Sequence, residues 1–560
     1  MNQLAVVHQG RGIDCFALDA HTFRIRLRCA AGDFDRVELC YALNKYEWHM
    51  GQQRTPMQRW GSDGITDYYT YDLQGEETRI AYIFILHRGK RKWYFSEEGV
   101  SKDYDFSKGY YTFFQYPYVH DCDIHHTISW ADRAVIYQIF PERFAIGIPG
   151  KEYITAAWDK KPTPKDYYGG DLPGIEQHLD YLTDLGVNCI YMTPVNPAKS
   201  NHKYNIMDYD DVDRDFGGKE ALISLVHTAH QRGMKVMLDG VYNHCSWETP
   251  MFQDVIKKGK ESPYWDWFFV DGDNVDLKHP NYLMFAACPD MPKLNTGCPA
   301  VIEYFSSLAA KWTKEYGIDG WRLDVMDEIS YEFLRAFRKA VKAVNPDAVI
   351  LGEAWHEPAV WLRGDQLDSV MNYGLTKALM DYLVERKLDA AGMASRLMRL
   401  YMRTTSMSAR MMLNLMGSHD THRFLTLLNG DKARLKLAFA IMFFYVGMPC
   451  IYYGDEVGME GGYDPGCRGG FPWDSTKWDH ELRKAVQQLC LLKTSGKLSG
   501  DEIQIQSMGD ALVISRQHAQ LIVNGTDQPI ELEIKGITHH LDACTYVVTS
   551  FEQRKESSIP

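Results

Sequence analysis

The N-terminal part of the chain alternates between apolar and polar residues. In the segment TFRIRLRCA (22–30), Phe23, Ile25 and Leu27 fall on one side of an extended strand and three arginines fall on the other. Further runs of this kind at 36–43, 67–74 and 79–88 are separated by turn-like segments. Short strands at this spacing predict a β-sandwich over residues 1–125.

From Ala134 the pattern changes to apolar runs alternating with amphipathic segments. One such segment, 221–233, places apolar residues at helical spacing and ends in Gly233, the residue that commonly follows a helix C-terminus. Eight runs of this kind predict a (β/α)8 barrel over residues 126–500. The runs lie at 134–140, 188–195, 235–242, 320–325, 348–355, 368–373, 411–417 and 448–455.

Two segments lie outside the eight repeats. Residues 245–300, after the third run, are too long for an ordinary connection and predict a small inserted subdomain over the top of the barrel. After about residue 500 short alternating runs return. They predict an antiparallel β domain over 501–560.

Three acids end three of the barrel runs: Asp324 in GWRLDV, Glu353 in ILGEAW and Asp420 in MGSHDTHR. Catalytic groups of such barrels come from the C-terminal ends of several strands, so these acids are expected to meet in one site. Two carboxylates on either side of one bond are the usual means of breaking a glycosidic linkage.

The neighbours of two of these acids suggest distinct roles. Arg322 is two residues before Asp324, on the same face of the strand, where a guanidinium would lower the pKa of that carboxyl and keep it ionised. Trp355 is two residues after Glu353, where an apolar ring would favour the protonated form that a general acid needs. The alternative for Arg322 and Asp324 is a structural ion pair of the barrel core.

Composition limits the kinds of partner. The 560 residues carry 61 basic and 74 acidic side chains, a net charge of −13, which argues against nucleic acid. The longest apolar stretch, 437–453, is short for a bilayer span and is interrupted by Gly447 and Pro449, so a buried helix and strand are expected in place of a membrane segment. No secretory signal is visible, and the twelve cysteines have no CxxC pair, so reduced thiols and a cytoplasmic location are expected.

Taken together and in order, the motifs resemble a known family. DGVYNH, GWRLDVMDE, GEAW and MGSHD are similar to the four signature regions of the α-amylase family of glycoside hydrolases. MPKLN (291–295) resembles a fifth region found in the cyclomaltodextrinase, neopullulanase and maltogenic amylase subgroup, which also carries an N-terminal β-sandwich.

The resemblance implies a role for each matching residue. Asp324 would be the nucleophile and Glu353 the acid/base of a retaining mechanism, with their carboxyl groups about 5 to 5.5 Å apart, while Asp420 would hold sugar hydroxyls. The remaining matches would contact the sugar or brace the site. Arg322, His244 and His419 would frame it, Tyr204 would stack beneath it, Asp464 and Arg468 would contact it, and Asp239 and Asn243 would brace the site.

The resemblance also implies several subsite positions. Glu328 matches a position on the leaving-group side that influences transglycosylation, and Trp355 and Phe285 would be apolar platforms there. Tyr46 would reach the active site of a partner subunit in a homodimer built through the N-terminal domain. The alternative for Tyr46 is an ordinary sandwich residue.

One departure from the subgroup concerns metal. Where calcium ligands usually follow PERF, this chain has AIGIPG, with Ile146 and Ile148 in place of oxygen ligands. Aliphatic side chains cannot coordinate a hard cation. Asp171 alone is a poor site, so no calcium and no other cofactor are expected.

The expected function is that of a cyclomaltodextrinase-type glycoside hydrolase. Its expected substrates are cyclomaltodextrins and short α-1,4 maltooligosaccharides, with glycosyl transfer as a further activity. Three alternatives stay open: a neopullulanase or maltogenic amylase preferring pullulan or linear glucans, a glucanotransferase, and a non-catalytic carbohydrate-binding protein.

Overall fold

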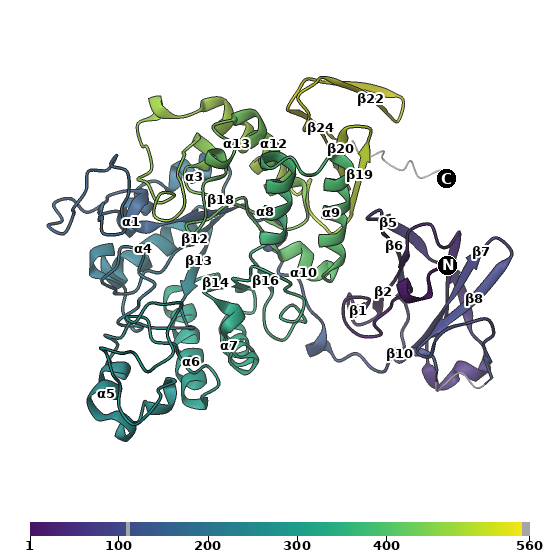
Figure 1. The fold of residues 1–560 in the computed structure, drawn as a ribbon, viewed down its shortest axis with the longest axis horizontal. Helices are drawn as coiled ribbons and strands as arrows, with labels where there is room; N and C mark the ends of the chain where they lie inside the picture. The colour runs from purple at the N-terminus through teal and green to yellow at the C-terminus, as the bar shows by residue number, and fades with distance from the viewer. Residues whose placement is uncertain (108–111, 551–560) are drawn as a thin grey trace.

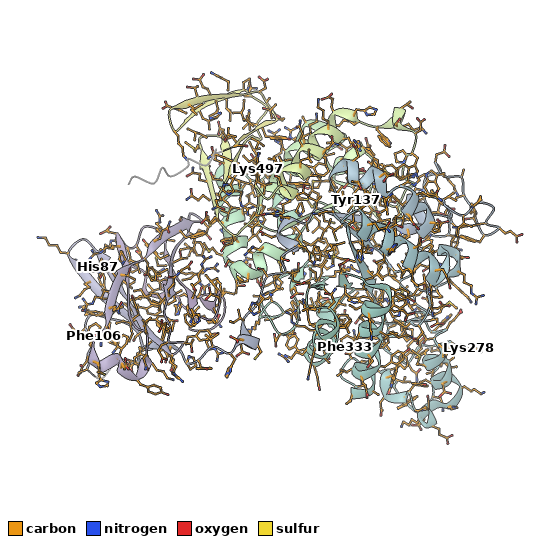
Figure 2. The ribbon with its side chains drawn as sticks, turned by 180° about the vertical axis from the view of Figure 1, so that it is seen from behind. His87, Phe106, Tyr137, Lys278, Phe333 and Lys497 are labelled. Carbon is orange, nitrogen blue, oxygen red and sulfur yellow. The ribbon has the colours of Figure 1, made fainter. Side chains whose placement is uncertain are left out.

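The protein has three parts in a row, as the ribbon of the computed structural model shows (Figure 1). The structure describes residues 1–107 and 112–550. An N-terminal β domain lies at one end, the barrel occupies the middle, and a small β domain packs on the barrel side that faces the N-terminal domain. In the reverse view His87 and Phe106 mark the N-terminal domain, Tyr137 and Phe333 the barrel, and Lys278 the inserted segment (Figure 2).

The N-terminal domain consists of two antiparallel sheets that enclose one apolar core. One sheet has the order β1-β2-β6-β5. The other has the order β4-β3-β7-β8-β9, with β10 also pairing with β7. The predicted strands at 22–30, 36–43, 67–74 and 79–88 are confirmed. The strands are β1 (Cys15–Ala17), β2 (Thr22–Ala30), β3 (Arg36–Ala42), β4 (Gln53–Pro56), β5 (Gln58–Ser62), β6 (Thr66–Gln74), β7 (Ile80–Arg88), β8 (Arg91–Ser96), β9 (Gly99–Ser101) and β10 (Phe114–Tyr116).

Two of the three arginines of β2, Arg24 and Arg26, are buried as well, because they pack against the other two parts of the chain. Arg24 is 8% exposed and its Nη1 donates to Asp501 Oδ2 at 2.5 Å, at the start of the C-terminal domain. Arg26 is 2% exposed and its Nη1 donates to the Thr404 carbonyl at 2.7 Å, after a barrel helix. The polar side of this strand therefore holds the domains together.

The barrel strands form a parallel sheet in the order β16-β15-β14-β13-β12-β11-β18-β17. The ring closes between its two ends, where Met371 pairs with Leu413 and Asn372 N donates to the Leu413 carbonyl at 2.8 Å. All eight predicted runs are confirmed. The strands are β11 (Ile136–Ile139), β12 (Cys189–Met192), β13 (Lys235–Gly240), β14 (Gly320–Leu323), β15 (Val349–Gly352), β16 (Ser369–Val370), β17 (Leu413–Asn414) and β18 (Met448–Tyr452).

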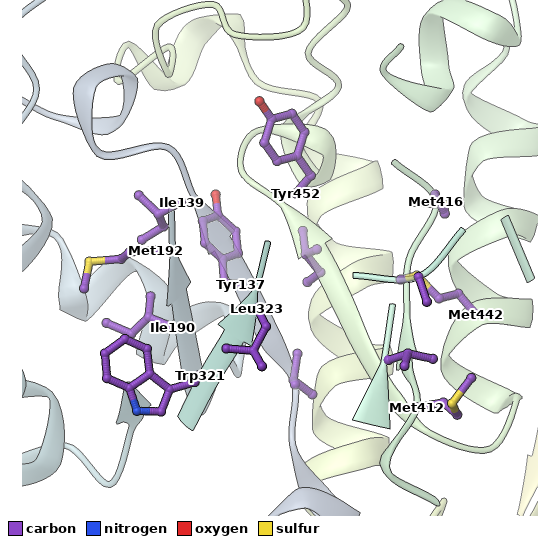
Figure 3. Packing of buried hydrophobic residues seen from close by; sticks show 14 of the residues in the cluster. Tyr137, Ile139, Ile190, Met192, Trp321, Leu323, Met412, Met416, Met442 and Tyr452 are labelled. Atoms are coloured by element: carbon purple, nitrogen blue, oxygen red, sulfur yellow. The ribbon is translucent and has the colours of Figure 1, made fainter. Parts of the chain in front are cut away.

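Alternation along these strands creates two separate apolar layers. Ile190, Trp321 and Leu323 point outward and pack beneath the surrounding helices (Figure 3). Tyr191 and Met237 point inward and fill the barrel. Since side chains alternate with period two, the polar residues that share the inward face come together at the strand ends.

Helices cover the barrel at most of its connections. The segment predicted at 221–233 forms α4, and Gly233 adopts a left-handed φ of 73° just after it, as expected. The helices are α1 (Pro141–Phe144), α2 (Leu172–Gln177), α3 (Leu179–Leu185), α4 (Gly218–Gln231), α5 (Pro250–Lys258), α6 (Pro299–Tyr316), α7 (Tyr331–Val344), α8 (Tyr373–Leu379), α9 (Ala390–Met402), α10 (Ser406–Met411), α11 (Phe424–Leu427), α12 (Lys432–Phe444) and α13 (His480–Thr494).

One connection departs from the expected repeat. Residues 353–368, between β15 and β16 and all within the described chain, form turns and no helix. Pro358 interrupts helical hydrogen bonding there, and Gly364 takes a left-handed φ of 97°. The long apolar stretch 437–453 behaves as predicted, as the end of α12 followed by β18.

Two segments remain: the insertion between β13 and α6, and the small C-terminal β domain. Between β13 and α6 the chain forms α5 and several short bridges, including His244 with Lys293. The C-terminal domain has one sheet, β19-β20-β21-β24, and a hairpin, β22-β23. Residues 551–560 of its predicted range lie outside the described residues. The strands are β19 (Ile503–Met508), β20 (Ala511–Arg516), β21 (Ala519–Asn524), β22 (Ile530–Ile534), β23 (Ile537–Leu541) and β24 (Thr545–Ser550).

Among residues 1–107 and 112–550, none of the helices combines the length and the apolar character needed to cross a bilayer. All twelve cysteines lie in this described part and carry free thiols, most of them buried.

Candidate active site

The barrel register brings the predicted acids together. Asp239 on β13 is the direct neighbour of Arg322 on β14, and both face the barrel interior. Asp324 and Glu353 follow immediately after β14 and β15, two residues beyond inward-facing Arg322 and Leu351, which are themselves register partners. Two adjacent strand ends therefore deliver two carboxylates side by side.

A single guanidinium joins three of the acids. Arg322 is fully buried, and its Nη1 donates to Asp324 Oδ1 at 2.8 Å and to Asp239 Oδ2 at 2.9 Å. Its Nη2 lies 2.9 Å from Glu353 Oε2. The positive charge of one residue thus holds carboxylates from three successive strands at one point.

Glu353 is held by two further donors. The backbone N–H of Val325 donates to Oε2 at 2.9 Å, and the indole Nε1 of Trp355 donates to Oε1 at 3.0 Å. The Trp355 ring stacks on Tyr373 with 3.7 Å between ring centroids. The sequence predicted an apolar ring beside this acid, and the structure places the ring there with its N–H edge turned toward the carboxylate.

Asp420 follows β17, which is two strands from β15 around the closed ring. Its Oδ1 accepts from Arg468 Nη2 at 3.1 Å, and its Oδ2 lies 3.2 Å from His419 Nε2. Arg468 Nη1 also lies 3.0 Å from Asp464 Oδ1. The two residues expected from the segment after the eighth strand are therefore placed beside the third acid.

Tyr204 connects the two halves of the site. Its hydroxyl donates to Asp239 Oδ2 at 2.9 Å and lies 2.6 Å from His419 Nε2. The Tyr204 and His419 rings are parallel within 3°. A continuous buried network thus runs from Arg322 through Asp239 and Tyr204 to His419.

Sequence reasoning missed two members of this network. Gln138 on β11 places its amide Nε2 2.9 Å from His419 Nδ1, and Tyr191 on β12 donates to Asp239 Oδ2 at 2.7 Å. With Gln138 donating to Nδ1, the proton of His419 resides on Nε2. The alternation of side chains along the barrel strands could have identified them, because both are polar or amphipathic residues at inward positions.

The inserted segment supplies the other wall. The His244 ring stacks on Phe285 with 4.6 Å between centroids, and His244 Nε2 lies 4.0 Å from Asp324 Oδ2. Lys293 bonds Asn243 Oδ1 and Glu328 Oε2, the latter at 2.7 Å. The predicted residues Phe285, Asn243 and Glu328 are thus brought to one side of the site.

Tyr46 is not brought to these residues within one chain. It is 68% exposed, on the short helix η2 (Lys45–Met50) of the N-terminal domain, beside the Lys45 ammonium. Its neighbour Trp48 is 1% exposed and packs on Phe113, so it is a core residue of that domain.

Burial governs the protonation of the site. It raises the pKa of Asp324 well above its ordinary value, with repulsion from Glu353 and Asp239 in the same direction, although Arg322 opposes the shift. The expectation of a lowered pKa was therefore wrong: desolvation outweighs the ion pair. Burial also raises the pKa of Asp239 to about 6 and lowers that of His244 to about 3, so this imidazole is neutral at pH 7.

In the segment 145–151, where the resemblance would place calcium ligands, a lysine side chain supplies the positive charge. Asp171 is fully buried, and its carboxylate accepts from the backbone N–H groups of Gly147 and Ile148, each at 2.9 Å. Lys151 Nζ donates to Asp171 Oδ2 at 2.6 Å and to the Gly169 carbonyl at 2.7 Å. The Ile146 side chain is exposed.

A closed parallel barrel with paired carboxylates at adjacent strand ends, bounded by neutral imidazoles and a tyrosine, defines a class of protein. It is a (β/α)8-barrel glycoside hydrolase.

Comparisons with known proteins agree with this class and give the family. The alpha amylase catalytic domain matches residues 138–501, and the alpha amylase N-terminal ig-like domain matches residues 1–120. The chain therefore belongs to the alpha-amylase family.

Several relatives match most of the chain. A cyclomaltodextrinase of Geobacillus thermopakistaniensis (strain MAS1) is 44% identical, over 88% of this chain and 84% of its own. Neopullulanase 2 of Thermoactinomyces vulgaris is 38% identical, over 95% of this chain and 92% of its own. A solved cyclomaltodextrinase structure superposes with a TM-score of 0.90 at 38% identity, covering 95% of this chain and 93% of that one. These relatives support the assignment of the chain as an α-glucan hydrolase.

Because the pKa of Asp324 is raised, we expect this residue to lower the free energy of unfolding near neutral pH. A carboxyl whose pKa is raised in the folded state stabilises the fold below its unfolded pKa, and this stability is lost as the pH rises through the folded pKa. Asp324→Asn removes the buried charge, so its free energy of unfolding should exceed that of wild type by at least about 1 kcal/mol at pH 7.5. The difference should shrink toward pH 4. Urea unfolding at both pH values measures it.

The matched control for this experiment is Asp510→Asn, at an exposed position. It should change the free energy of unfolding by less than about 0.5 kcal/mol at either pH. A less stable Asp324→Asn variant at pH 7.5 would show that the ion pair with Arg322 outweighs desolvation.

Proposed function

We propose that the chain hydrolyses α-1,4-glucosidic bonds of cyclomaltodextrins and short maltooligosaccharides by double displacement. The observation that carries the proposal is the contact of Asp324 and Glu353 with the two terminal nitrogens of one guanidinium, at 2.8 and 2.9 Å. The retaining mechanism needs the two carboxyl groups about 5 to 5.5 Å apart, and their shared contact with one guanidinium supports a close pair. The names of the relatives, cyclomaltodextrinase, maltogenic amylase and neopullulanase, support the substrate class.

In this mechanism the ionised form of Asp324 attacks the anomeric carbon while Glu353 gives its proton to the leaving oxygen. A covalent glycosyl-enzyme forms. Glu353 then takes a proton from water, which attacks the same carbon and releases the sugar with its original configuration. When a sugar hydroxyl replaces water, the product is a transferred glycoside.

The other side chains of the site hold the sugar. Asp420, fixed by Arg468, accepts from ring hydroxyls, and His419 is neutral because burial lowers its pKa well below the usual value. The Nε2 of this neutral imidazole lies beside the Tyr204 hydroxyl, so His419 positions Tyr204 without adding charge to the site. The Tyr204 ring, held parallel to His419, offers an aromatic surface to the sugar.

A neopullulanase or maltogenic amylase is the nearest alternative, because a neopullulanase matches the chain over 95% of its length. Initial rates on β-cyclodextrin, pullulan and soluble starch, measured side by side, distinguish the two. The proposal expects the highest rate on β-cyclodextrin and products released with α-configuration, followed by NMR. A higher rate on pullulan would favour the alternative, transfer products exceeding reducing ends would indicate a glucanotransferase, and inverted configuration would exclude double displacement.

Glu353→Gln tests the acid assignment. The amide keeps the shape of the side chain but cannot donate the proton, so turnover of β-cyclodextrin should fall by about 10²- to 10⁴-fold or more. Circular dichroism should stay as in wild type. Glu328→Gln serves as the control, since this residue bonds Lys293 at the rim, and its turnover should fall far less. A Glu353→Gln variant within a few-fold of wild type would refute the role.

A homodimer through the N-terminal domain is part of the proposal, as is a cytoplasmic location. The exposure of Tyr46 supports the dimer, because an aromatic residue that is 68% exposed is suited to contact a partner subunit. Light scattering of the full chain should give twice the 64.5 kDa chain mass. A monomer mass would contradict the dimer.

The fold is also proposed to need no calcium ion near residues 145–151. The Lys151 ammonium already neutralises the buried Asp171 carboxylate and bonds a neighbouring carbonyl, which are the contacts a bound cation would make. The side chain of Lys151 is only 7% exposed, so this ion pair is shielded from solvent.

EDTA should therefore leave the melting temperature almost unchanged, whereas Lys151→Met should lower it. Removing one partner of a buried pair leaves a charge without compensation, which costs about 3 to 5 kcal/mol. Lys161→Met, at an exposed position nearby, is the control and should have little effect. A fall of many degrees with EDTA would reveal a metal site.

A further inference from the structure

A second cavity, of about 600 Å³, lies away from the barrel acids, where the N-terminal and C-terminal domains meet. Gln58 and Trp60 of β5 form one wall, and Gln504 and Gln506 of β19 form the facing wall. Figure 1 shows β5 and β19 next to each other beside α9. We call this space the interdomain cavity.

Strand alternation directs these side chains into the cavity. On β19, Ile503 and Ile505 are 2% and 7% exposed and pack inward, so Gln504 and Gln506 point out, toward β5. Gln517 and Gln520, from the turn after β20 and from β21, add two further amides. Five glutamines from two domains therefore face one space.

Most of these amides have unused hydrogen-bonding capacity. Gln520 Nε2 donates to Ser515 Oγ at 2.8 Å. Within the described residues the side chains of Gln58, Gln504, Gln506 and Gln517 form no hydrogen bond. Each amide offers two donors and one acceptor oxygen, which matches a ligand whose groups both donate and accept.

The charges of the cavity favour a neutral ligand. Arg516 is 3% exposed and its N–H groups donate to backbone carbonyls, including Gly500 O at 2.6 Å and Glu502 O at 2.9 Å. The other charged lining residues, Glu502 and Lys535, have opposite signs. The cavity therefore carries no concentrated positive charge for phosphate or nucleic acid.

Trp60 adds a fixed aromatic wall. Its ring lies parallel to Tyr401 within 13°, and the Arg24 guanidinium lies 5.4 Å from its centroid, so the indole is held in place from the barrel side and from its own domain. Ile534 and Met508 contribute apolar surface nearby. Aromatic and apolar walls with interspersed amides suit a molecule with C–H faces and hydroxyl edges.

We propose that the interdomain cavity is a second binding site for a neutral oligosaccharide, separate from the site of cleavage. Its assignment to α-1,4-glucans rests on the proposed function. None of its lining residues belongs to the active site, so a glucan held there would keep the enzyme attached to a substrate molecule while the barrel cleaves another part of it or another chain.

The experiment uses the full chain carrying Glu353→Gln, so that maltoheptaose is bound without being consumed. Isothermal titration should show two classes of site. Adding Gln504→Ala and Gln506→Ala should remove one class, with at least a tenfold loss of its affinity, and leave the other unchanged. Both glutamines are exposed and form no hydrogen bonds to described residues, so the fold should persist, as the melting temperature will show.

Gln3→Ala, an exposed glutamine of the N-terminal domain, is the control and should retain both classes. A single class of site in the Glu353→Gln chain, or two classes persisting after the double substitution, would overturn the proposal. Turnover of maltoheptaose by the wild-type chain is measured separately. Absence of cleavage would reject the proposed function, while the titration would still decide the second site.

Discussion

The arrangement of the active site depends on one buried guanidinium shared by three carboxylates. Arg322 has no solvent exposure, and it contacts Asp239, Asp324 and Glu353 from three successive strands. A buried charge is stable only when paired, and here one positive charge faces three acids. The excess of negative charge cannot be fully neutralised, which is why desolvation and mutual repulsion raise the pKa of Asp324. A site built in this way binds protons readily and holds its acids close together.

The residues around the guanidinium restrict how the acids can move. Asp239 accepts from Tyr191 and Tyr204, and Tyr204 leads through His419 to Gln138 on the first barrel strand. Each link is a buried hydrogen bond between groups that would be costly to leave unpaired. The network therefore crosses the barrel and connects the strands that carry the acids with the strand where the barrel begins.

Arginine side chains also join the domains. Arg24 forms an ion pair with Asp501, and Arg26 donates to the Thr404 carbonyl of the barrel. Arg399 on α9 reaches back to Asp63 of the N-terminal domain at 3.1 Å. Specific pairs of this kind fix the relative position of the three parts. They leave between β5 and β19 the space that the glutamines line.

The sequence alone determined the strand and helix pattern, the closed barrel, the family and the clustering of Asp324, Glu353 and Asp420. Those features follow from local alternation and from motifs at strand ends, which are encoded in neighbouring residues. It did not determine that 353–368 would lack a helix, that Trp355 would turn its N–H toward Glu353, or that burial would outweigh Arg322 at Asp324. Nor could it show that Lys151 reaches Asp171, or that Gln58 and Gln504, from opposite ends of the chain, face one cavity. These depend on distances and solvent exclusion between segments remote in sequence, which exist only once the chain has folded.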